Sequence, residues 1–396
     1  MQMTFHRWSV IMILLLVTLI AIVQCDESFW KPAIEDLVNG DLNQVHVFFR
    51  YGHRVPLKRY PTDPNANATL WNEGLGKLTA LGRQQAYLLG KNLKARYSTI
   101  IPKERAFNKV HIRSSESDRT QMTAETVLAS LFIPEGVDRW ADIDWQPIPI
   151  HTVPIKDDNI LTSGVYCPKY EQLLNNLPED ISKDDQGIHE FIAEMSGLPM
   201  NTLLDVADLY TCLDIELQAG LRLPQWTDVV FPDFMRAQTA KYMYRATMTS
   251  DLIRLRIGPL YKELLNFNNT EKSFNLYSTH DAILSDVLGG LGLRVNPPDF
   301  VSVIAIEFRI NSDIGDHAQL WWREGPYDEL EQMAWPGCGE RCPIEKLKEI
   351  LSPLIPLNWT AECLLRKVAN TELVKTKVNL NNAYLPFVCY YILTIQ

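Results

Sequence analysis

The order of apolar runs along the first third of the chain predicts two consecutive strand–helix units. The first run is rich in β-branched and aromatic residues and stops abruptly at the charged Arg50, as expected of a buried strand. After a loop rich in Pro and Asn, Thr79 is placed to cap a helix in which leucines recur at roughly helical spacing. The pattern then repeats. The predicted elements are strands over 42–49 and 109–113 and helices over 80–97 and 117–130.

Between residues 146 and 240 the chain lacks convincing strand patterns, which predicts an inserted, mainly helical lobe. Strand and helix patterns then resume, so that residues 40–145 and 241–396 together form one α/β core. We expect its sheet to be mostly parallel and flanked by helices. The later predicted elements are a helical region over 242–265, a strand over 274–278, a helix over 281–290 and a late β pair over 301–309 and 318–322.

The two ends of the chain carry apolar stretches. The first follows a single positive charge at Arg7, runs from Val10 to Val23 and then turns polar. It predicts a secretory signal peptide over residues 1–25, with a membrane anchor as the alternative. The last, Tyr384–Ile395, is too short to cross a bilayer and predicts a buried strand. We therefore expect a secreted or lysosomal protein without a membrane span in its mature chain.

Composition and charge narrow the classes of function. The chain has 38 Lys and Arg against 48 Asp and Glu among 396 residues, without a long basic run, so a nucleic-acid partner is not expected. Six cysteines follow the first 25 residues, which fits disulfides in an oxidising compartment. Cys338 and Cys342 enclose a small glycine-containing loop and are expected to pair, the alternative being a zinc site. Sequons at Asn67, Asn268 and Asn358 predict glycosylation.

Polar residues with distinctive chemistry follow three predicted strands. They are RYGHRVP at 50–56, RSSESDRT at 113–120 and the His-Asp pair at 280–281. Because an α/β sheet gathers the carboxyl ends of its parallel strands at one edge, we expect Arg50, Arg54 and Arg113 to converge there. Converging guanidinium groups hold a phosphate dianion through bidentate hydrogen bonds. A phosphate monoester is therefore the predicted ligand.

The pair His280 and Asp281 begins a helix, where backbone amides and the helix dipole favour an anion. The alternative for such a pair is an ordinary helix cap. Beside a bound phosphate, like charge would raise the pKa of Asp281, so that it could protonate a departing alkoxide. Arg119 is either an outer member of the arginine group or the ion-pair partner of Asp118. No metal or other cofactor is expected, since no cluster has ligand spacing.

With these motifs the chain resembles the histidine acid phosphatases of the secreted and lysosomal branch. The family fingerprint is R-H-G-x-R-x-P, then I-R-S-x-x-x-D-R-T, then H-D before a helix, and the chain matches it from about residue 45 to residue 363. The resemblance implies a phosphoglycerate mutase-like α/β core, a helical insertion and transfer through a phosphohistidine. By motif match it assigns phosphate binding to Arg50, Arg54, Arg113 and His280, and proton donation to Asp281.

One position departs from the fingerprint, because the nucleophilic histidine of the family falls at Tyr51. A phenol, with an ordinary pKa near ~10, must lose a proton before it attacks. We therefore expect phosphate binding with weak or absent hydrolysis. One alternative is an active phosphatase in which His53, after a shift at Gly52, or Tyr51 itself attacks phosphate. The other is a noncatalytic secreted binding protein.

The resemblance also implies a disulfide between Cys167 and Cys363. Cys212 then either pairs with Cys389 or stays free. The expected partner is a small phosphorylated substrate or ligand, and the choice between a monomer and a homodimer stays open.

Overall fold

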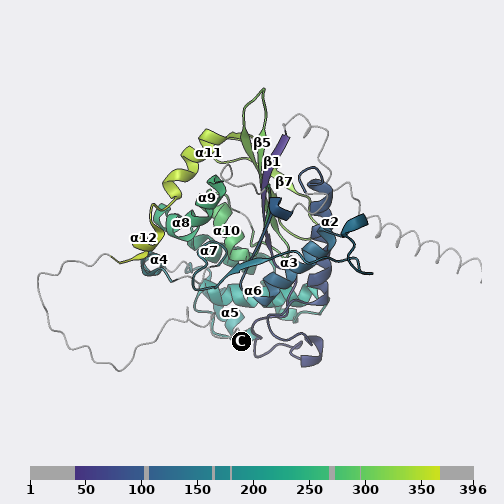
Figure 1. The fold of residues 1–396 in the computed structure, drawn as a ribbon. Helices are drawn as coiled ribbons and strands as arrows, with labels where there is room; N and C mark the ends of the chain where they lie inside the picture. The colour runs from purple at the N-terminus through teal and green to yellow at the C-terminus, as the bar shows by residue number, and fades with distance from the viewer. Residues whose placement is uncertain are drawn as a thin grey trace, which may run out of the picture.

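The computed structural model describes residues 41–101, 107–162, 166–178, 181–266, 273–294 and 296–365. One sheet lies at its centre (Figure 1). The strand order is β3-β2-β4-β1-β5-β6-β7, and β8 pairs with β6. The strands are β1 (Asp41–Arg50), β2 (Val110–Ser115), β3 (His151–Val153), β4 (Phe274–Thr279), β5 (Val303–Ile310), β6 (His317–Arg323), β7 (Glu331–Met333) and β8 (Cys342–Pro343).

The sheet is mixed, which corrects the expectation of a mostly parallel one. Strands β1, β2, β3 and β4 are paired in parallel, whereas β5, β6, β7 and β8 make antiparallel pairs. The connections between β5, β6 and β7 are short, and a short connection can join only antiparallel neighbours. The α/β class with helices flanking the sheet is confirmed.

Helices cover both faces of the sheet. Strand β1 shows this, because its consecutive residues point to opposite sides and pack in different cores. Val47 and Phe49 pack against α2 (Ala80–Arg96) and α3 (Asp118–Leu131). Phe48 lies in the second core, beneath α9 (Gly258–Leu265), α10 (Asp281–Gly290) and α11 (Ile344–Leu351). Figure 1 shows the two groups of helices on opposite sides of the sheet. Thr79 caps α2 as expected, since its hydroxyl accepts a hydrogen bond from the Gly82 amide.

A separate apolar core lies below the sheet in the view of Figure 1. It joins α5 (Gln186–Ser196), α6 (Leu203–Gln218) and α7 (Asp233–Arg245) to Tyr60 from the loop after β1. Strand β3 was missed, because three residues are too few to display a period. The helical region expected over 242–265 is broken into the end of α7, α8 (Ser250–Arg256) and α9. The division at residues 146 and 240 stays a prediction.

Two disulfides join the pairs Cys167–Cys363 and Cys338–Cys342, the same pairs that the sequence analysis expected. The first ties α4 (Pro168–Asn175) to α12 (Trp359–Cys363). Cys212 is a free, buried thiol.

The sequons at Asn67 and Asn358 have exposed asparagines, whereas Asn268 lies outside the described residues. The expected signal peptide over 1–25 and the expected strand at 384–395 also lie outside them. None of the helices in the described ranges is long and apolar enough to cross a membrane.

Candidate functional site

The carboxyl ends of β1 and β4 place two of the motifs side by side. In the parallel register, Arg50 lies opposite Thr279, so the residues that follow each strand become neighbours. One guanidinium nitrogen of Arg50 lies 3.1 Å from Asp281 Oδ2, and the other terminal nitrogen donates to the carbonyl oxygen of Pro298 at 2.6 Å. The Arg50 guanidinium also lies 4.2 Å from the centre of the Phe300 ring. Arg50 is thereby fixed between Asp281, at the start of α10, and the 297–300 loop.

Tyr51 lies at the centre of three arginines. Their Cζ atoms lie 4.7 Å (Arg119), 5.2 Å (Arg50) and 5.9 Å (Arg54) from the centre of its ring. Arg54 Nε donates to the phenol oxygen at 3.2 Å, and the ring is 3% exposed. Burial by itself raises the pKa of this phenol, but the positive charges of Arg54, Arg50 and Arg119 outweigh burial and the repulsion from Asp281. They lower the pKa of Tyr51 to about 8.

His280 and Asp281 take opposite charge states. Burial, followed by the charge of Arg119, lowers the pKa of His280 to about 3, so its ring is neutral. Its Nε2 lies 2.9 Å from Ser115 Oγ, and its Nδ1 lies 3.4 Å from a terminal nitrogen of Arg119. Burial opposes ionisation of Asp281, yet Arg50 and a backbone amide hydrogen bond hold the pKa of this carboxyl below its usual range. Asp281 is therefore a carboxylate before any ligand binds.

Arg113 does not join the group around Tyr51, which corrects the expectation from the sequence. It pairs with Asp158 at 2.6 Å and approaches Glu263 at 3.6 Å. In β2 the pleat turns Arg113 away from the face that carries Ile112. Arg119, in the first turn of α3, supplies the third guanidinium instead. We call Arg50, Arg54 and Arg119 the arginine cluster.

His53 is not available as an alternative nucleophile. Its ring is buried, with Nε2 donating to the carbonyl oxygen of Ile215 at 3.0 Å and Nδ1 2.8 Å from Thr79 Oγ1. Burial lowers the pKa of His53. The turn cannot shift freely, because Gly52 packs so tightly on Gly82 that a Cβ would collide with the Gly82 carbonyl group. These contacts engage both ring nitrogens of His53 and argue against its attack on phosphate.

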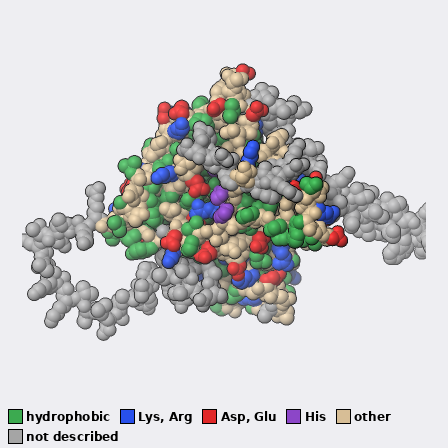
Figure 2. Space-filling view, in the orientation of Figure 1, with side chains coloured by type: hydrophobic (Ala, Val, Ile, Leu, Met, Phe, Trp, Pro, Cys, Tyr) green, Lys and Arg blue, Asp and Glu red, His purple; other side chains and the backbone are tan. Residues whose placement is uncertain are grey.

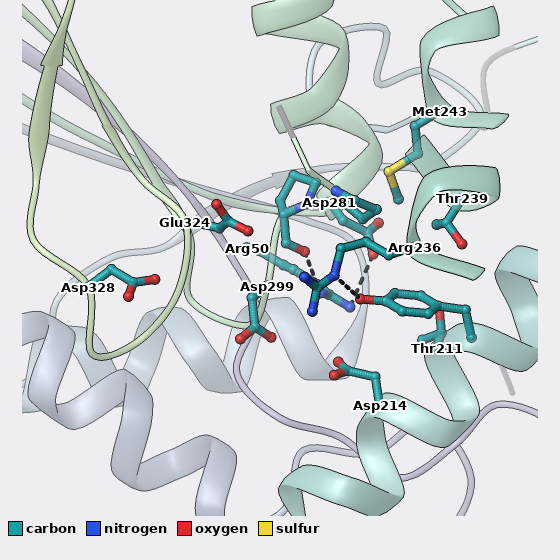
Figure 3. A pocket seen from close by; sticks show the side chains of 13 residues that line it. Arg50, Thr211, Asp214, Arg236, Thr239, Met243, Asp281, Asp299, Glu324 and Asp328 are labelled. Carbon is teal, nitrogen blue, oxygen red and sulfur yellow. Dashed lines mark hydrogen bonds and ion pairs between the residues drawn. The ribbon is translucent and has the colours of Figure 1, made fainter. Parts of the chain in front are cut away.

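A cavity of about 110 Å³ opens beside Arg50 and Asp281 (Figure 3). In the view of Figure 2, basic, acidic and histidine side chains lie near the middle of the visible face of the molecule. Sequence reasoning missed most of the lining residues, because they come from α6, α7 and the 297–299 loop and carry no motif. The lining comprises Arg50, Tyr210, Thr211, Asp214, Arg236, Thr239, Met243, Asp281, Pro297, Pro298, Asp299, Glu324 and Asp328.

Two guanidinium groups of the cluster keep unused donors. Among the described residues, neither Arg50 Nε nor Arg119 Nε has a hydrogen-bond acceptor, although both atoms are buried. A buried donor without an acceptor is costly, and a bound anion would supply one. Within the same residues, no group of three or more His, Cys, Asp or Glu side chains is arranged to hold a metal ion.

Comparisons with known proteins show the family and the fold of the chain. Residues 33–302 match the family described as the histidine phosphatase superfamily, branch 2. Human prostatic acid phosphatase is 32% identical over 360 residues, covering 85% of this chain and 91% of that protein. Human lysosomal acid phosphatase is 31% identical over 359 residues, covering 84% and 83%. Among solved structures, a Hafnia alvei phytase in complex with tartrate matches with a TM-score of 0.60 at 15% identity, covering 82% of this chain and 98% of that one.

Proposed function

The chain belongs to branch 2 of the histidine phosphatase superfamily, and from this premise we propose that it binds phosphate monoesters at the arginine cluster and hydrolyses them slowly or not at all. The observation that carries the proposal is Tyr51 at the centre of the cluster. It stands where the family fingerprint has the nucleophilic histidine. The protein would thus be an acid-phosphatase-like pseudoenzyme.

The binding half of the proposal rests on charge and on unused donors. Arg50, Arg54 and Arg119 bring three positive charges to a largely buried place, and two of their Nε atoms have no acceptor among the described residues. Neutral His280 would add a hydrogen bond rather than a charge. A phosphate dianion would offset the positive charge, and its oxygens would accept hydrogen bonds from the two Nε atoms.

The catalytic half rests on the chemistry of the phenol. With a pKa of about 8, roughly one per cent of Tyr51 is phenolate at pH 6, whereas a neutral imidazole carries a free lone pair there. A phosphotyrosine ester also reacts with water more slowly than a phosphohistidine does. Both steps of the transfer are therefore slowed in an acidic medium.

A second candidate is a phosphatase that uses the Tyr51 phenolate, and the lowered pKa favours it. The phenolate oxygen would form a bond to phosphorus while the ester oxygen leaves and takes a proton from Asp281. Asp281 would first have to gain that proton through the repulsion of the bound phosphate. Water would then cleave the phosphotyrosine and release phosphate. This enzyme would gain activity as pH rises toward 8, unlike the pseudoenzyme.

The setting of the protein is part of the proposal. The predicted signal peptide, the two disulfides and the exposed sequon residues Asn67 and Asn358 support a secreted or lysosomal glycoprotein. We keep the division into a core of 40–145 and 241–396 and a lobe of 146–240. The choice between monomer and homodimer stays open, as does a noncatalytic role on the protein surface.

The test compares hydrolysis of p-nitrophenyl phosphate by the wild type, Tyr51→His and Tyr51→Phe from acidic to alkaline pH, beside calorimetric binding of inorganic phosphate. We expect phosphate binding by the wild type and a gain on the order of 10³-fold or more in hydrolysis for Tyr51→His. Wild-type turnover at about 1 to 10³ per second in acid would overturn the proposal. Activity that grows with pH and is lost in Tyr51→Phe would favour the second candidate instead.

A further inference from the structure

The cavity beside Arg50 is unusually acidic for a site that receives a phosphate ester. Its lining carries five carboxylates against two guanidinium groups (Figure 3). Arg50 is already paired with Asp281 at 3.1 Å. The second guanidinium group of the lining belongs to Arg236, which shares the cavity with the remaining carboxylates. Arg236 Nε donates to the Tyr210 hydroxyl at 3.3 Å.

The lining brings charges of both signs close together. Arg50 and Asp281 belong both to the cavity and to the surroundings of Tyr51, so one end of the cavity adjoins the arginine cluster. The buried Nε of Arg50 has no acceptor among the described residues, which marks this end for an anion. Beside it the lining is acidic, with Asp214 on α6 and Asp299 on the 297–299 loop.

Asp214 and Asp299 are held close together by Gln218. The amide nitrogen of Gln218 donates to Asp214 Oδ2 at 3.1 Å and to Asp299 Oδ1 at 2.8 Å. The backbone amide of Phe300 also donates to Asp299 Oδ1 at 2.6 Å, so the donors to the two carboxylates are neutral amides. In the described part of the chain, no ion pair within 4.0 Å involves either of them. Burial and then the charge of Asp299 raise the pKa of Asp214 to about 6, a sign of the same repulsion.

We propose that Asp214 and Asp299 select phosphate monoesters whose alcohol carries an ammonium group, with the phosphate at the arginine cluster and the cation between these two carboxylates. The inference rests on the proposed function, because it names the ligand class of the same site. Both carboxylates lie near Arg50. The charge of Asp299 acts on the Arg50 guanidinium, and the charge of Arg50 acts on Asp214. A short aminoalkyl phosphate therefore has complementary charge at both ends.

The same lining disfavours a polyanion. A ligand with several phosphate groups would place negative charge against Asp214, Asp299 and Glu324, with Arg236 as the partner cation in this part of the cavity. Like charges in a partly enclosed space repel strongly, and this repulsion provides selectivity as well as attraction does.

The test measures dissociation constants by calorimetry near neutral pH for inorganic phosphate, phosphorylcholine and 3,3-dimethylbutyl phosphate. The last two have the same shape, but the ester lacks the positive charge because carbon replaces nitrogen. We expect the wild type to bind phosphorylcholine at least about tenfold more tightly than its neutral counterpart. Asp299→Asn and Asp214→Asn should each lower this ratio toward one, whereas Glu345→Gln, on the distant α11, should leave it unchanged.

The ratio is measured within each variant, so a modest loss of folded protein does not mimic the effect. If the wild type binds inorganic phosphate but binds the two esters equally, the inference is wrong and the proposed function stands. If the ratio persists in both Asn variants, these two carboxylates do not cause the selectivity and the inference is wrong. Failure of the wild type to bind inorganic phosphate at all would instead defeat the proposed function itself.

Discussion

Replacing Tyr51 with Phe removes the phenol on which the proposed function depends and leaves the ring in place. The pKa of Tyr51, about 8, lies some 2 units below the ordinary value of 10, which corresponds to about 3 kcal/mol of preference for the phenolate in the folded protein. A lowered pKa stabilises the fold fully above the unfolded value of about 10. This stabilisation declines as pH falls and is lost below about 8. Between a pH below 8 and pH 9, the free energy of unfolding of the wild type should rise by about 1.4 kcal/mol relative to that of Tyr51→Phe.

The assay is a spectroscopic titration of phenolate absorbance, joined to urea unfolding at several pH values. We expect the wild type to titrate one phenol near pH 8 that is missing in Tyr51→Phe. Burial raises the pKa of the other buried tyrosines, including Tyr60, Tyr97 and Tyr261, so they titrate later. The matched control Tyr87→Phe, at an exposed position, should keep the early step. A wild type without that early step would refute the assigned surroundings of Tyr51.

Three further outcomes test other parts of the structure. Arg119→Met should weaken phosphate binding by about tenfold or more, whereas Arg113→Met should change it little, and calorimetry with inorganic phosphate compares the two. Gly82→Ala would push a methyl group into the backbone of His53, and we expect about 1–3 kcal/mol of destabilisation in thermal unfolding, with a normal melting temperature counting against this contact. Cys167→Ser opens a bridge between residues 196 positions apart and should cost about 2–5 kcal/mol, measured by urea unfolding of the oxidised proteins.

The sequence predicted the elements that carry the motifs because their apolar runs are long and their caps are strong. It located β1, α2 and β4 to within a residue or two. It expected the motifs that follow β1 and β4 to meet at one edge of the sheet, where Arg50 and Asp281 form an ion pair. It chose Arg113 over Arg119 because spacing along a chain does not say which way a side chain points at the end of a strand. The pleat of β2 and the first turn of α3 decide that question.

Other features depend on contacts between distant segments and leave no local signal. Nothing in the neighbourhood of His53 indicates that α6 will supply the carbonyl oxygen that engages its ring. Asp214 and Asp299 likewise look like ordinary acidic residues until α6 and the 297–299 loop meet through Gln218. The antiparallel half of the sheet was visible as a late β pair, and only its direction was missed.

The residue at position 51 changes what the arginine cluster needs. Three guanidinium groups within 6 Å of one ring require negative charge nearby, and Asp281 supplies part of it through its ion pair with Arg50. Tyr51 provides such a charge itself once its phenol ionises at about pH 8. Phenolate and ligand then compete for the same donors, so anion binding is favoured in acid, where the phenol is neutral. An acidic compartment is thus where the cluster would bind its ligand best and where Tyr51 would attack it least, so under the proposed function a single substitution would separate binding from hydrolysis.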